Sequence, residues 1–101
     1  MFKNSRYVTA SIMAEVPLEQ QMLMWGILDK FLAQGVEIDY LQVIELSIKM
    51  DEKGKKQQLI KHRQEVPSYQ REYIVSVEQP INEKIFIIDD GNTTMLLASE
   101  Y

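Results

Sequence analysis

The chain has 101 residues, a formal net charge of −4 and no cysteine. This length fits one domain with one core, and the lack of cysteine excludes disulfides, thiolate nucleophiles and cysteine-ligated metal sites. No apolar run approaches the roughly 20 residues of a membrane helix, and the N-terminus lacks the apolar segment of a secretory signal. We therefore expect a cytoplasmic protein with no membrane partner.

The N-terminal segment alternates between two kinds of side chain. Val8, Ala10 and Ile12 fall on one face of an extended chain, and the residues between them fall on the other. A period of two is typical of a half-buried strand. The pattern predicts a first strand from Arg6 to Ala14.

A helix is predicted from Pro17 to Gln34. Proline suits the first position of a helix, and Gly35 is the expected stop. At 100° per residue the helix has an apolar stripe made of Leu18, Met22, Trp25, Leu28 and Leu32. Its edge is extended by Met24, Ile27 and Phe31. The arc covers about half the circumference, more than a surface helix needs. Either the helix lies deep in a curled sheet, or another chain covers this edge.

Two strands with a polar turn follow the helix. Residues 40–50 alternate as a strand, and residues 51–54 form a turn that contains glycine. Residues 57–66 are strand-compatible but polar, so we place them at an edge or with one face in water. Pro67 ends that strand.

Three more strands complete the chain. Residues 69–77 alternate, whereas residues 83–89 contain the run Ile85-Phe86-Ile87-Ile88, which is apolar on both faces, and are predicted to be central. Asp90-Gly91 indicates a tight hairpin, because glycine accepts a positive φ. Residues 93–98 then form a last strand, with a short terminal helix as the alternative.

The predicted elements give the order β-α-β-β-β-β-β. Short turns between successive strands favour antiparallel pairing. We expect a single α+β domain over residues 1–101, in which one amphipathic helix packs on a mainly antiparallel, curled sheet of five to six strands.

Few residues carry signals for catalysis. The four glycines are scattered, so no phosphate-binding loop is present. His62 is the sole histidine, and an enzyme that pairs it with Glu65 or Glu72 is the least favoured hypothesis. Asp89 and Asp90 are expected to shape a hairpin rather than hold a cation. We expect no catalytic residue, no metal and no cofactor.

A basic segment lies in the middle of the acidic chain. Residues 53–73 contain six basic and two acidic residues, a net charge of +4, which leaves −8 for the rest. If the two strands around Pro67 form a hairpin, one surface would collect Lys61, Arg63, Tyr69, Arg71 and Tyr73. Basic groups bind phosphates and rings stack on bases, so this surface is a candidate for single-stranded nucleic acid. The acidic total disfavours it, and the alternative is a solvated edge.

Five short segments together carry a family resemblance. They are Val16-Pro17-Leu18-Glu19-Gln20, Ile38-Asp39-Tyr40-Leu41-Gln42-Val43, His62-Arg63-Gln64-Glu65-Val66-Pro67, Ile87-Ile88-Asp89-Asp90-Gly91 and Thr94-Met95-Leu96-Leu97. In this order they resemble an uncharacterised family of small Gram-positive bacterial proteins, domain of unknown function family 960. The resemblance implies a short, standalone cytoplasmic protein of bacteria. The family carries no assigned activity, cofactor or catalytic residue.

The leading hypothesis is a non-enzymatic protein-interaction or regulatory module. It would bind another protein, or its own copy as a homo-oligomer, through Met24, Ile27 and Phe31. The alternative is nucleic-acid binding through the basic and aromatic strands.

Overall fold

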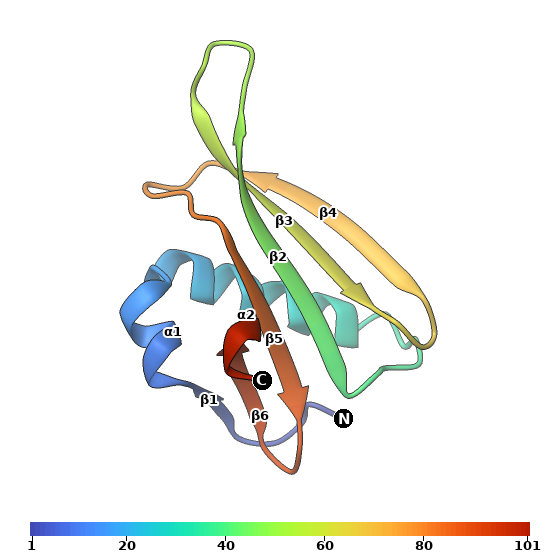
Figure 1. Cartoon of the computed structure of the whole chain (residues 1–101). Coiled ribbons are helices and arrows are strands. Elements are labelled where there is room, and N and C mark those ends of the chain that lie inside the picture. The colour runs from blue at the N-terminus through green and yellow to red at the C-terminus, as the bar shows by residue number, and fades with distance from the viewer.

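The computed structural model describes the whole chain, residues 1–101, as a six-stranded sheet with one long and one short α-helix (Figure 1). In chain order the elements are β1 (Arg6–Val8), α1 (Ala10–Glu15), α2 (Leu18–Leu32), β2 (Leu41–Met50), β3 (Lys56–Gln64), β4 (Tyr69–Val75), β5 (Glu83–Asp89), β6 (Thr93–Leu97) and the 3-10 helix η1 (Ala98–Glu100). The predicted α+β class, with one main helix on a mainly antiparallel sheet, is confirmed.

The strands lie in the spatial order β1-β6-β5-β2-β3-β4, and the sheet is not closed. All neighbouring strands are antiparallel except β1 and β6, which are parallel. Strand β5 is internal, as its apolar sequence predicted. The polar strand β3 is also internal. It is therefore not the edge strand of the first alternative, and the second alternative, a strand with one face in water, holds.

Helix α2 covers one face of the sheet, which we call the helix face, and leaves the other, the open face, uncovered by it (Figure 1). Side chains of the helix face pack with α2 into one core cluster, to which every internal strand contributes. Its fully buried strand residues include Ile44, Ile60, Ile85, Ile87 and Met95.

The first strand is shorter than predicted. Strand β1 ends at Val8, and residues 10–15 form helix α1 instead of continuing the strand. Thr9 is the N-cap of α1, and its hydroxyl accepts a hydrogen bond from the N–H of Ile12 at 3.2 Å. A threonine N-cap stabilises the start of a helix, and in so short a segment it outweighs the alternation.

Helix α2 lies within two residues of the predicted limits, Pro17 and Gln34, but buries a different side. It begins at Leu18, directly after Pro17, and ends at Leu32. Leu18 and Met22, predicted to lie in the apolar stripe, are 69% and 63% exposed. Gln20 and Gln21 are buried in their place, so the predicted stripe is wrong in its N-terminal half.

Hydrogen bonds explain why these glutamines face inward. The amide of Gln21 donates to the carbonyl of Val16 at 2.8 Å, just beyond the end of α1. The amide of Gln20 donates to the carbonyl of Gln79 at 2.6 Å, in the segment before β5. Both side chains tie α2 to neighbouring backbone, since buried polar groups need partners.

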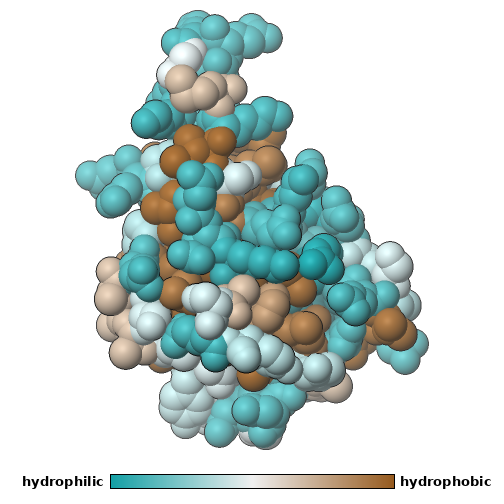
Figure 2. Space-filling model, viewed as in Figure 1, coloured by the Kyte–Doolittle hydropathy of each residue, from teal (hydrophilic) through white to brown (hydrophobic).

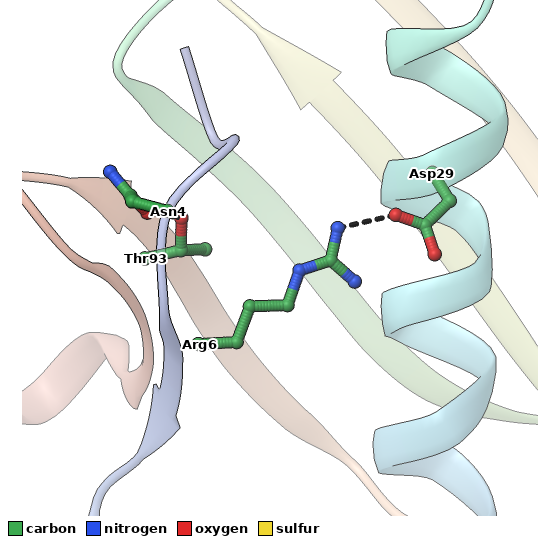
Figure 3. A network of polar contacts seen from close by, with 4 residues as sticks. All are labelled: Asn4, Arg6, Asp29 and Thr93. Carbon is green, nitrogen blue, oxygen red and sulfur yellow. Dashed lines mark hydrogen bonds and ion pairs between the residues drawn. The ribbon is translucent and has the colours of Figure 1, made fainter.

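The N-terminal strand is fastened to both α2 and β6 (Figure 3). Arg6 forms an ion pair with Asp29 of α2, and its guanidinium carbon lies 5.0 Å from the ring centroid of Trp25. On the other side of the strand, the hydroxyl of Thr93 donates to the side-chain oxygen of Asn4. These contacts hold β1 at the edge of the sheet.

Candidate functional site

The three helix residues predicted to form a docking edge are buried by the chain's own sheet. Met24 is 0%, Ile27 8% and Phe31 1% exposed. The ring of Phe31 lies 4.4 Å from that of Tyr69, centroid to centroid. The sheet therefore covers Met24 and Phe31 completely and leaves only a small part of Ile27 exposed, so the three side chains do not form the exposed docking edge that was predicted.

A different part of α2 is open. A groove of about 430 Å³ runs along its outer side and is lined by Glu19, Met22, Leu23, Gly26, Ile27 and Lys30. We call it the α2 groove. A Cβ added at Gly26 would meet no atom within 4 Å, so the centre of the groove is empty. Lys30 lies beside β4, with its ammonium 5.8 Å from the ring centroid of Tyr73.

A second hollow of about 370 Å³ lies where α1 meets α2. Met13, which is 66% exposed, and Leu18 both line it. Leu18 and Met22 are one helical turn apart and so are neighbours on the helix surface. The exposed apolar strip Met13-Leu18-Met22 therefore links this hollow to the α2 groove.

The basic and aromatic candidates do not share a surface. Strands β3 and β4 form the predicted hairpin, but Lys61 pairs with Glu72 in its register. Odd-numbered residues of the two strands therefore point to opposite faces. Lys61 and Arg63 lie on the open face, whereas the helix face receives Tyr69, Arg71 and Tyr73. The platform for single-stranded nucleic acid is not assembled.

Charges of opposite sign lie opposite one another across the strands of the open face. The register places Lys84, Glu45, Lys61 and Glu72 in one row over four neighbouring strands, with alternating sign. The ammonium of Lys61 lies 3.6 Å from the carboxylate of Glu72. Figure 2 shows this face, where hydrophilic residues form a band between hydrophobic areas. Such a row presents no continuous positive surface to phosphates.

The aromatic candidates pack against the domain itself. The ring of Tyr69 contacts those of Phe31 and His62. The ring of Tyr73 has two cations near it, the ammonium of Lys30 and the guanidinium of Arg71, the latter 5.4 Å from its centroid. Tyr69 and Tyr73 are thus half-buried against the core beneath β4 and do not stand free as a stacking platform.

His62 is a buried core residue. Its Nε2 lies 2.7 Å from the amide oxygen of Gln42, and its Nδ1 has no hydrogen-bond partner. Burial lowers the pKa of His62 to about 4. Because Gln42 offers an oxygen, the neutral ring carries its proton on Nε2. Glu65 and Glu72, the predicted acid partners, make no hydrogen bond or ion pair with this ring.

Comparison with known proteins identifies the family. The family model described as "Staphylococcal protein of unknown function (DUF960)" matches residues 5–100. The chain belongs to the DUF960 family. A solved structure, titled as that of the protein of unknown function from Enterococcus faecalis, is similar to this DUF960 protein with a TM-score of 0.74 and 23% identity over 97% of this chain and 91% of that chain. No curated protein matches this sequence.

The acidic residues of this DUF960 protein do not gather into a metal site. No group of three or more histidine, aspartate or glutamate side chains is placed to hold an ion. Asp89 instead accepts a hydrogen bond from the N–H of Gly91 at 3.1 Å, in the role expected for it at the hairpin. A membrane-spanning helix needs about 20 mostly apolar residues, and no helix of this chain meets that requirement.

Proposed function

We propose that this DUF960 protein is a non-enzymatic interaction module of the cytoplasm that docks a protein on the outer side of α2. The proposal rests on the α2 groove. Its apolar lining residues are Met22, Leu23 and Ile27, and the space above Gly26 between them is unoccupied. Contiguous exposed apolar surface on a small protein marks interaction sites more often than isolated apolar residues do.

The side chains along this surface are suited to binding a protein. Met13 and Met22 are flexible and polarizable, and such side chains adapt to a partner's shape. Fully burying a methionine or leucine side chain contributes roughly 1.5–3 kcal/mol. Met13, Leu18 and Met22 are all exposed in the folded chain. Their burial against a partner would therefore contribute favourable free energy to binding.

The surroundings of His62 support a role without catalysis. A general base must reach the proton that it removes. His62 is 1% exposed, and its Nε2 is engaged by Gln42. The rings of Phe31 and Tyr69 pack against its own.

The proposal is tested by site-specific photo-crosslinking. A photoreactive amino acid replaces Met22 in the tagged protein inside its host, and a matched variant carries it at Ile74, an exposed apolar position in β4. We expect a discrete crosslinked protein, either this chain or another, from position 22 and none from position 74. No adduct at position 22, or the same adducts from both positions, would contradict the proposal.

A further inference from the structure

The residues that line the α2 groove form a pattern that is symmetric along the helix. Its midpoint lies between Met24 and Trp25. The equidistant pairs are Glu19 with Lys30, Met22 with Ile27, and Leu23 with Gly26. Each pair is complementary: opposite charges, two apolar side chains, and a large residue with an empty position.

We propose that the occupant of the α2 groove is the α2 helix of a second copy of this chain, packed antiparallel about a two-fold axis. This inference rests on the proposed function and names its partner. In a two-fold contact the same patch serves on both copies, so residue i meets residue j and j meets i. An antiparallel crossing at the midpoint brings together the members of each complementary pair.

Gly26 fits this arrangement, whereas nothing within the chain itself requires a glycine at this position. Glycine in a helix interior costs about 1 kcal/mol relative to alanine. Nothing in the fold lies within 4 Å of a Cβ placed there, and Gly26 has no positive φ. Between two copies, the empty position receives Leu23 of the other helix, and small residues let helices approach closely.

The two charges at the ends of the groove define the orientation. The three ion pairs of the chain use neither Glu19 nor Lys30. A carboxylate oxygen of Glu19 accepts the N–H of Glu78 at 3.1 Å, and the ring of Tyr73 lies under the Lys30 ammonium. Both groups are thereby held at the groove ends. An antiparallel copy would make two Glu19–Lys30 pairs, whereas a parallel copy would place like charges together.

Sedimentation equilibrium with charge-reversed variants tests the proposal. We expect the purified wild-type chain to dimerise reversibly between micromolar and millimolar concentration. Glu19→Lys and Lys30→Glu each replace two attractive pairs by two repulsive ones, so each weakens dimerisation by about tenfold. The matched control is Lys53→Glu at the exposed β2–β3 turn, which should leave dimerisation unchanged.

Mixing the two reversed variants provides the decisive arm. Glu19→Lys and Lys30→Glu chains complement each other at both groove ends, so their mixture should regain wild-type affinity as a heterodimer. A wild-type chain that stays monomeric throughout, or a mixture that stays as weak as its components, would overturn the proposal. If that chain nevertheless crosslinks to a different protein from position 22, the proposed function stands and the second copy is not its partner.

Discussion

Glu19 and Lys30 lie at opposite ends of one groove on helix α2, and neither forms an ion pair within its own chain. Between them the helix shows apolar side chains and a glycine. Opposite charges at the two ends make this surface complementary to itself in the antiparallel orientation. Both the proposed protein docking and the proposed antiparallel contact between two copies therefore depend on this groove.

Gly26→Ala is predicted to have opposite effects on folding and on association. The new methyl group meets no atom of the chain, and alanine favours helix, so the free energy of unfolding should rise by up to about 1 kcal/mol. The same methyl occupies the position that Leu23 of a second copy needs, so dimerisation should weaken. Urea unfolding at a concentration where the chain is monomeric measures the first effect, and sedimentation the second. Unchanged association would count against close packing at Gly26.

His62 should make the protein lose stability in mild acid. Its pKa is about 4 in the folded chain, below the ordinary value of 6.5, so the folded state binds its proton less readily than the unfolded state. The stability that neutral His62 contributes is full above pH 6.5 and is lost as the pH falls toward 4. Between pH 7.5 and 5 this amounts to about 2 kcal/mol.

The matching variant for this prediction is His62→Gln. Its amide can still donate to Gln42 but does not titrate, so the stability loss between pH 7.5 and 5 should largely disappear. Urea unfolding across this pH range compares the two proteins. Equal pH dependence in wild type and variant would show that the imidazole is accessible to protons in the folded state.

Asp89 is predicted to fasten the N-terminus in its ionised form. Its carboxylate accepts the backbone N–H of Phe2 at 2.7 Å and the side-chain amide of Asn4 at 3.1 Å. The hydrogen bond from Phe2, followed by that from Gly91, lowers the pKa of Asp89. A lowered carboxyl pKa stabilises the fold above the unfolded pKa and stops doing so as the pH falls through the folded value.

The Asp89→Asn variant should therefore have a lower free energy of unfolding than the wild type at neutral pH. This difference should shrink when the pH falls below about 4. Amide hydrogen exchange at Phe2 should speed up in the variant. Asp90→Asn is the control, because Asp90 is exposed and its side chain makes no hydrogen bond. A stability difference that stays constant down to low pH would contradict the assigned role of the charge.

Gln64→Leu is predicted to lower the free energy of unfolding by roughly 2–4 kcal/mol, because it leaves buried partners unpaired. The buried amide of Gln64 donates to the carbonyls of Glu37 and Pro67, and its oxygen accepts the N–H of Asp39 at 2.9 Å. The control is Gln57→Leu in the same strand, whose side chain lies on the open face. Thermal unfolding of both variants checks the prediction, and equal losses would refute it.

The strands could be predicted from the sequence because alternation is a local property. Residues 40–50 alternate and residues 83–89 contain the apolar run 85–88, and both form strands close to those limits. The side of α2 that is buried could not be predicted in the same way. Gln20 and Gln21 face inward because carbonyls at Gln79 and Val16 receive their amides, and such partners are invisible in a helical wheel.

The site was missed for related reasons. Met24, Ile27 and Phe31 looked like an uncovered edge only because the predicted buried stripe included Leu18 and Met22. Likewise, whether Lys61 shares a face with Tyr73 depends on the register of a hairpin, which composition does not determine. One usable signal was present in the sequence: Gly26 in the middle of a predicted helix, where a side chain is expected.

Disulfide trapping tests the antiparallel α2 contact most directly, because the chain has no cysteine of its own. Glu19→Cys and Lys30→Cys chains are oxidised separately and as a mixture. In one helix these positions are about 16 Å apart along the axis, so an antiparallel pair brings position 19 only to position 30 of the other copy. We expect disulfide-linked heterodimers in the mixture and little product from either variant alone. No crosslinked product in the mixture, or equal homodimers from each variant alone, would rule out the antiparallel contact.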